Sequence, residues 1–187
     1  MKCSVFIACS ADGYIATSEG ATAWLQSAGN TAVDLGAESD MGFARFIASV
    51  DCMIMGRRTM DAIADMNLSD EQWPYGDICL AVLSRTLKAV PDPLLDKVEW
   101  VSSDIKELLS KLDAKGCRHA YVDGGATISS LLEQKLIDEM TITIAPVLLG
   151  AGLPLFHQLG CSINLENARA KAYANGFIQI QYTVNYA

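Results

Sequence analysis

Three short segments, each at the end of an apolar run, pair a hydroxyl residue with glycine, with arginine or with both. They read GRRT at 56–59, LSRT at 83–86 and DGGAT at 123–127. Glycine lets a backbone approach a ligand closely, and the free N–H groups at a helix start bind anions. Arginine adds guanidinium groups whose geometry suits phosphate oxygens. Together these segments predict a site for a molecule that carries several phosphates.

The two arginines of GRRT occupy an unusual place. A helix start carries partial positive charge and favours Asp or Glu, yet Arg57 and Arg58 lie where a helix is expected to begin. A bound polyphosphate would satisfy both the helix end and the guanidinium groups. The sequence lacks the glycine patterns G-x-G-x-x-G and G-x-x-x-x-G-K-[ST], so a different nucleotide-binding fold is expected.

Asp40 is the candidate catalytic residue. It lies three residues before Phe43 and seven before Ile47, which places it on the apolar face of an expected helix. One interpretation is a carboxylate that caps the first turn of that helix. The other is a partly buried carboxylate that binds the N–H groups of a heterocycle and helps to protonate it. Spacing alone leaves both open.

The elements that must position these residues alternate along the chain. Apolar runs bounded by polar residues predict buried parallel strands at 3–9, 52–55, 78–83, 98–101 and 120–122. Apolar stripes at helical spacing predict helices over 43–50, 105–112 and 128–136.

The end of the chain follows a different pattern. Apolar and polar residues alternate strictly over 178–186, and Asn175-Gly176 predicts a hairpin turn that pairs this strand with 165–173. The whole pattern predicts one α/β domain over 1–187, with a mostly parallel central sheet flanked by helices and a C-terminal antiparallel hairpin. Ligands of such sheets bind beyond the carboxyl ends of the strands, where the three segments lie.

Composition and net charge indicate which kinds of molecule the protein is not expected to bind. The chain has 187 residues, of which 51% are hydrophobic and 19% charged, and its net charge of -8 argues against a nucleic-acid surface. No apolar run approaches the roughly 20 residues of a membrane helix. Six cysteines without C-x-x-C spacing and two histidines predict reduced structural thiols and no metal site. We therefore expect a cytoplasmic protein.

Several longer segments resemble the dihydrofolate reductase-like family. They are SADGYIA at 10–16, Trp24, DCMIMGRRT at 51–59, LSRT at 83–86, VDGGATISSLL at 122–132 and LIDEMTITIAPVLLGAGLPLF at 136–156. The nearest branch is similar to the reductase domain of bifunctional riboflavin-biosynthesis deaminase-reductases. The resemblance covers nearly the whole chain. It implies a dihydrofolate reductase-like fold and an NADPH-dependent oxidoreductase that commonly forms a homodimer.

The resemblance also implies roles for particular residues. The expected cofactor-binding residues are Ala16, Gly56, Arg57, Arg58, Thr59, Ser84, Arg85, Thr86, Gly124, Gly125, Ala126 and Thr127, with Arg85 placed for the adenosine 2′-phosphate. The expected substrate-binding residues are Asp12, Ile15, Trp24 and Phe43. Asp40 lies sixteen residues before Gly56, the spacing at which dihydrofolate reductases place their substrate-binding carboxylate.

The sequence departs from the riboflavin branch where a phosphoribosyl group would bind. Arginine-rich stretches of that branch correspond here to SAGNTAVDLGAESDMGF and MDAIADMNLSDEQWPYG, which lack basic residues, and Arg45 lies just beyond the first. An acidic pocket mouth would repel a phosphorylated substrate. An uncharged pterin-like or pyrimidine-like ring therefore fits as well as 5-amino-6-(5-phosphoribosylamino)uracil.

The leading hypothesis is an NADPH-dependent reductase of a pteridine or aminopyrimidine. Dihydrofolate reductase itself and a non-catalytic NADPH- or nucleotide-binding protein are the alternatives. A homodimer is expected, with Tyr182 and Tyr186 on the alternating last strand as a candidate interface. The same strand face could instead cover the core of its own domain.

Overall fold

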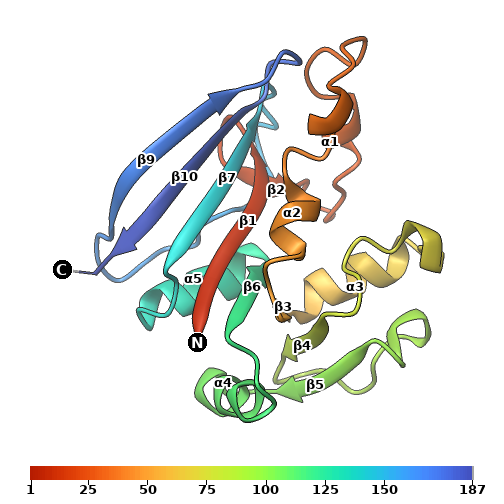
Figure 1. The fold of residues 1–187 in the computed structure, drawn as a ribbon, viewed down its shortest axis with the longest axis vertical. Coiled ribbons are helices and arrows are strands. Elements are labelled where there is room, and N and C mark those ends of the chain that lie inside the picture. The colour runs from red at the N-terminus through yellow and green to blue at the C-terminus, as the bar shows by residue number, and fades with distance from the viewer. Residues whose placement is uncertain (187) are drawn as a thin grey trace.

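Eight strands form one twisted sheet that runs through the whole molecule (Figure 1). The computed structural model describes residues 1–186. The spatial order of the strands is β5-β4-β3-β6-β1-β7-β10-β9. Their bounds are β1 Lys2–Ser10, β3 Cys52–Gly56, β4 Cys79–Leu83, β5 Val98–Ser102, β6 His119–Asp123, β7 Glu139–Ala145, β9 Asn164–Ala172 and β10 Ile178–Asn185. A separate two-stranded sheet joins β2, Tyr14–Ala16, to β8, Leu153–Pro154.

The strands from β5 to β7 in this order are parallel, and this brings their carboxyl ends to one edge. Gly56 at the end of β3 is paired with Leu83 at the end of β4. Met55 is paired with Asp123 at the end of β6. The three segments GRRT, LSRT and DGGAT therefore leave the same edge of the sheet next to one another, as the sequence predicts.

Helices cover both faces of the sheet. On one face α2, Phe43–Ile47, and α3, Arg57–Asp65, pack over Met53, Met55 and Tyr121. On the other face α4, Ile105–Ala114, and α5, Gly125–Glu133, pack over a second set of buried strand residues that includes Ile54 and Val122. The predicted α/β architecture with a mostly parallel sheet is confirmed.

The segments between these elements contain shorter helices. The α-helix α1 spans Trp24–Ser27, and single 3₁₀ turns are η1 Gly36–Glu38, η2 Asp70–Gln72 and η3 Asp92–Leu94. The helix predicted over 43–50 is only the short α2, and Gly42 precedes it with a φ of 88°. Within residues 1–186, none of the helices has both the length and the apolar character that crossing a membrane requires.

The C-terminal hairpin is formed by β9 and β10, which turn at Gly176 and pair antiparallel. Alternation along β10 predicts that its apolar residues share one face. Near the turn, however, Ile178 on that face is 43% exposed whereas Gln179 on the opposite face is 9% exposed. The burial of Gln179 is stabilised by hydrogen bonds, since its amide donates to Thr143 Oγ1 and to the Met41 carbonyl, both at 3.0 Å.

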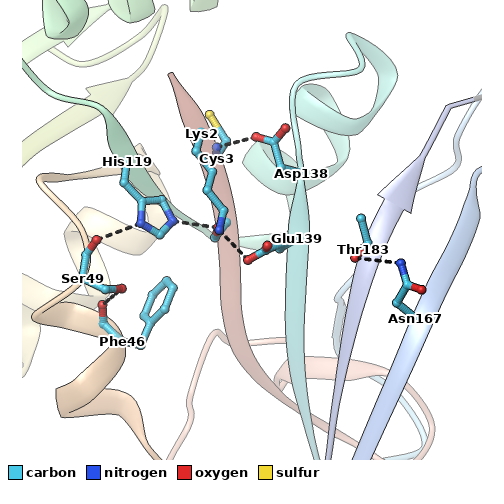
Figure 2. A network of polar contacts seen from close by, with 10 residues as sticks. Lys2, Cys3, Phe46, Ser49, His119, Asp138, Glu139, Asn167 and Thr183 are labelled. Atoms are coloured by element: carbon cyan, nitrogen blue, oxygen red, sulfur yellow. Dashed lines mark hydrogen bonds and ion pairs between the residues drawn. The ribbon is translucent and has the colours of Figure 1, made fainter.

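The opposite edge of the sheet, where the parallel strands begin, is held by polar contacts (Figure 2). The His119 ring bridges the Ser49 carbonyl and the Ser4 hydroxyl, both at 2.8 Å. Asp138 accepts from the Cys3 backbone N–H at 2.7 Å, and Lys2 forms an ion pair with Glu139 at 2.7 Å. These side chains stabilise the edge of the sheet opposite to the one that GRRT, LSRT and DGGAT leave.

Candidate functional site

A large open cavity of about 1840 Å³ lies beyond the carboxyl ends of the parallel strands. Its walls come from the ends of β3, β4 and β6, the starts of α3 and α5, the segment after β2, and the segment that leads into α2. The sheet topology explains this position. β1 lies between β6 and β7, so the chain passes over β1 on its way from β6 to β7. Ligands of such sheets bind beyond the carboxyl ends of the strands, where the strand order changes direction.

Two helix starts face this cavity without a side-chain cap. No side chain accepts a hydrogen bond from the first turn of α3 or α5, and neither first turn contains an acidic residue. The first N–H groups of a helix have no partner within it. Both helix starts can therefore donate hydrogen bonds to an anion in the cavity.

The arginines add positive charge at the same place. Arg57, Arg58 and Arg85 line the cavity and are exposed. Arg57 forms an ion pair with Asp61 one turn later, at 3.0 Å. No hydrogen bond or ion pair is found for Arg58 or Arg85 within residues 1–186, so both guanidinium groups are available to a ligand.

Ser84 organises the turn that carries Arg85. Its hydroxyl oxygen accepts from the backbone N–H groups of Thr86 at 3.2 Å and Leu87 at 2.9 Å. The hydroxyl proton remains free to be donated, because both bonds use the oxygen as an acceptor. Ser84 can thus fix the turn and bind a phosphate oxygen at the same time.

Close packing between the two helix starts explains the glycines. Gly124 has a φ of +90°, and a Cβ there would lie 2.4 Å from Thr59 Oγ1. A Cβ on Gly56 would lie 2.8 Å from Thr127 Oγ1. Any larger residue would therefore separate the loop after β3 from the loop after β6. The glycines hold the two anion-binding helix starts together and leave threonine hydroxyls beside them.

Aromatic side chains form another wall of the cavity. Phe43 lies 5.6 Å from Phe6 and 6.2 Å from both Tyr75 and Tyr121 between ring centroids. All four rings line the cavity. Such a wall suits the faces of a planar heterocycle, because offset and edge-to-face ring contacts stabilise beyond area burial alone.

Asp123 is a functional candidate that the sequence analysis treated only as part of an anion-binding loop. It lines the cavity at the end of β6. Burial raises the pKa of its carboxyl to about 6, although hydrogen bonds from the Gly124 N–H and Tyr121 oppose this shift. A buried carboxyl with a pKa near neutrality can hold a proton for a reaction.

The hydrogen bonds around Asp123 depend on whether its carboxyl is protonated. Its Oδ1 accepts from the Gly124 N–H at 2.8 Å, and the Tyr121 hydroxyl donates to the Phe6 carbonyl at 3.1 Å. A hydroxyl has one proton, so Tyr121 cannot donate to Phe6 and to Asp123 at once. A protonated Asp123 could instead donate to the Tyr121 oxygen. An acidic residue at a strand end beside a Gly-Gly turn is the sequence signal that could have identified it.

Most of the residues predicted from the sequence meet at this cavity. Those that line it are Ile15, Ala16, Asp40, Phe43, Gly56, Arg57, Arg58, Thr59, Ser84, Arg85, Thr86, Gly124, Gly125, Ala126 and Thr127.

Asp12 and Trp24 are not brought to the cavity. Asp12 accepts from the backbone N–H groups of Leu149 and Gly150 and from the Ser10 hydroxyl, so it fixes the loop that follows β7. Trp24 packs in a small cluster with Tyr173 and Phe177 under the hairpin. The surroundings of both residues are set by tertiary packing that their sequence position does not reveal.

Asp40 lies at the cavity but acts as a helix cap. Its Oδ1 accepts from the Gly42 N–H at 2.9 Å and its Oδ2 from the Ala44 N–H at 2.8 Å. These backbone hydrogen bonds, the Ala44 bond first, lower the pKa of the carboxyl. A charged carboxylate with both oxygens engaged is a weak candidate for a proton donor. Of the two interpretations of Asp40, the geometry supports the cap.

The part of the chain that the structure describes contains no cluster of potential metal ligands. No three His, Cys, Asp or Glu side chains of residues 1–186 are arranged to hold a metal ion. The six cysteines are all free thiols. The donors at the cavity are those of an anion-binding site.

The fold and this site define an α/β protein of the dihydrofolate reductase-like class. A dihydrofolate reductase from Enterococcus faecalis, solved in complex with NADP(H) and RAB-propyl, shares the fold with a TM-score of 0.63 at 14% identity, over 98% of this chain and 96% of that one. Within this class the chain belongs to the RibD C-terminal domain family, whose model matches residues 2–179. The resemblance noted from the sequence motifs is thereby confirmed.

Two relatives match the chain over nearly its full length. A Shewanella sp. PV-4 structure, whose assignment to riboflavin biosynthesis is provisional, is 38% identical with a TM-score of 0.84, and the match covers 99% of each chain. The uncharacterized protein YwjB of Bacillus subtilis (strain 168) is 28% identical over 182 residues, which is 97% of each sequence. The family is a reductase domain, so the chain is of the oxidoreductase type.

Proposed function

We propose that this protein is an NADPH-dependent reductase that transfers a hydride to a pteridine-type or aminopyrimidine-type substrate. One observation carries the proposal: three post-strand loops, two uncapped helix starts and three arginines converge on one cavity that also has an aromatic wall. The anion-binding half suits the phosphates of a dinucleotide, and the aromatic half suits a flat ring.

The residues present fit NADPH. The N–H groups at the start of α3, with Arg57 and Thr59, would bind one part of the pyrophosphate. The uncapped start of α5, reached through Gly124, would bind the other part. Arg85, in the turn fixed by Ser84, would bind the adenosine 2′-phosphate, and this would favour NADPH over NADH. Bound in this way, NADPH supplies the hydride.

Asp123 would supply the proton that the reduction requires. When a ring carbon gains a hydride, the electron pair of the broken C=N bond moves to the ring nitrogen, which then takes a proton. Asp123 Oδ1 is held by the Gly124 N–H, so the proton would be carried on Oδ2. Phosphate charge nearby would raise the pKa of Asp123 further and keep it protonated.

Cofactor binding tests the proposal directly. NADPH and NADH are titrated into the purified protein, into Arg85→Ala and into Arg169→Ala, a control arginine on β9 outside the cavity. We expect Arg85→Ala to weaken NADPH binding by roughly 10- to 100-fold, because a charge-assisted phosphate contact is lost. The affinity for NADH, which lacks the 2′-phosphate, should stay nearly unchanged. Equal binding of NADPH by all three proteins would refute the assignment of Arg85.

Turnover distinguishes the proposal from its alternatives. A panel of pterins, dihydrofolate and aminopyrimidines is screened under NADPH by the absorbance of the reduced cofactor. The dihydrofolate reductase alternative relied on Asp40, whose oxygens are engaged by Gly42 and Ala44. A non-catalytic nucleotide-binding protein would bind NADPH but oxidise it with no member of the panel.

We also propose that the protein forms a homodimer in the cytoplasm. Ile178 and Leu165 on the outer hairpin are exposed, and an apolar strand face of this kind suits pairing with a second copy. The six free thiols fit a reducing compartment.

A further inference from the structure

The distribution of charge around the cavity is uneven. The arginines that line it, Arg57, Arg58 and Arg85, all follow β3 or β4, and no lysine of residues 1–186 lines it. The segments after β2 and before α2 contribute Glu19 and Asp40 and no arginine or lysine, and Asp61, Asp65 and Asp104 also line the cavity. The positive charge is therefore confined to the half that would hold the cofactor phosphates.

Two cations lie close to carboxylates on this side of the molecule, and neither lines the cavity. Arg45 does not line the cavity and lies beside Asp40, whose pKa it helps to lower after the backbone hydrogen bonds and against burial. Lys171 forms an ion pair with Glu38 and lies over the Tyr173 ring at 4.7 Å. Neither side chain supplies free positive charge to the ring-binding half.

Helix starts on this side are also closed to anions. The N–H groups of Gly42 and Ala44 at the start of α2 donate to the two oxygens of Asp40. A phosphate would have to displace a carboxylate that is already fixed by both bonds. The starts of α3 and α5 differ, since their first turns contain no acidic residue and their N-cap residues make no side-chain cap hydrogen bond.

We infer that the ring substrate carries no phosphate group and is a neutral or cationic heterocycle. This inference rests on the proposed reductase function and names its substrate class. A phosphorylated substrate would place its phosphate beside the carboxylates of Glu19 and Asp40, and these negative charges would repel one another. The arginines could not offset this repulsion, because the cofactor phosphates would occupy them. The aromatic rings beside Asp123 bind the heterocycle, whereas Glu19 and Asp40 exclude its phosphorylated derivatives.

A matched pair of ligands tests the inference. The protein is first saturated with NADPH, and binding is then measured for 5-amino-6-(5-phosphoribosylamino)uracil and for the same compound after removal of its phosphate by a phosphatase. We expect the phosphate-free form to bind about tenfold more tightly at low salt, and this preference to shrink at high salt.

A charge variant gives a second readout. Thr31 is an exposed residue that lines the cavity, so Thr31→Arg adds the missing positive charge without removing a packed side chain. We expect Thr31→Arg to tighten binding of the phosphorylated form severalfold and to leave the phosphate-free form unchanged; Thr31→Gln is the uncharged control.

The outcomes separate the two proposals. Tight NADPH binding together with equal or tighter binding of the phosphorylated form by the unmodified protein would overturn this inference alone. Failure of NADPH to bind at all would overturn the proposed function, and this inference with it.

Discussion

Replacing Asp123 with asparagine should stabilise the protein at neutral pH. Burial raises the carboxyl pKa from 3.8 to about 6 in the folded state. The folded state therefore binds more protons than the unfolded state between these two values, and stability falls as the pH rises through this interval. The asparagine side chain has nearly the same shape as the carboxyl but no charge to bury, so Asp123→Asn would not lose this stability.

The magnitude follows from the pKa shift. One pKa unit corresponds to 1.36 kcal/mol. The protonated fractions of Asp123 in the folded and unfolded states then give a fall of about 2 kcal/mol in the unfolding free energy between about pH 4.5 and pH 7.5. Urea unfolding of the parent protein and of Asp123→Asn at both pH values measures it. The unfolding free energy of Asp123→Asn, relative to that of the parent, should increase by about 2 kcal/mol as the pH rises through this interval.

Asp40→Asn is the matched control, since Asp40 has a lowered pKa. A lowered carboxyl pKa contributes stability that is present above the unfolded pKa and is lost only as the pH falls through the folded value. The difference between Asp40→Asn and the parent should therefore stay constant from about pH 4.5 to pH 7.5. Parallel profiles for Asp123→Asn and the parent would refute the assignment of a buried, readily protonated carboxyl at the end of β6.

Four other substitutions give independent checks. Asp40→Ala removes the cap of α2 and should lower the unfolding free energy by about 1 kcal/mol while turnover is retained; a loss of turnover with unchanged stability would restore Asp40 as the catalytic group. Gly124→Ala should destabilise by roughly 1–3 kcal/mol in thermal unfolding, because its φ is +90° and the new Cβ meets Thr59 Oγ1. Thr59→Ala in the same chain should recover part of that loss, and strict additivity would contradict the close contact. Ile178→Lys should convert a dimer to a monomer in sedimentation, whereas a parent protein that sediments as a monomer would contradict the proposed interface.

Periodicity made much of the fold predictable. Buried parallel strands read as short apolar runs, and β3, β4, β5 and β6 begin and end within a residue or two of the predicted limits. The amphipathic stripe over 105–112 became α4 because Asp104 caps it by accepting from the Glu107 N–H at 2.8 Å. The stripe at 43–50 gave only the five-residue α2, which begins at the predicted residue Phe43 but ends at Ile47.

The candidate site was predictable where its signals are local. Glycines and arginines directly after a strand must lie at one edge of a parallel sheet, so GRRT, LSRT and DGGAT could be assigned to one cavity from the sequence. Asp12 and Trp24 could not be placed in the same way. Their surroundings are set by the loop after β7 and by the hairpin, which are more than a hundred residues away in the chain.

What the sequence determined by itself was the class of fold and the anion-binding half of the site, because both depend on repeating patterns and on residues next to strand ends. Only the tertiary structure decided the role of each carboxylate. The backbone N–H groups of Ala44 and Gly42 lower the pKa of Asp40, whereas removal from solvent raises the pKa of Asp123 to about 6 against the hydrogen bonds from Gly124 and Tyr121. The pKa of a carboxyl depends on burial and on neighbours from distant elements, and these exist only once the chain has folded.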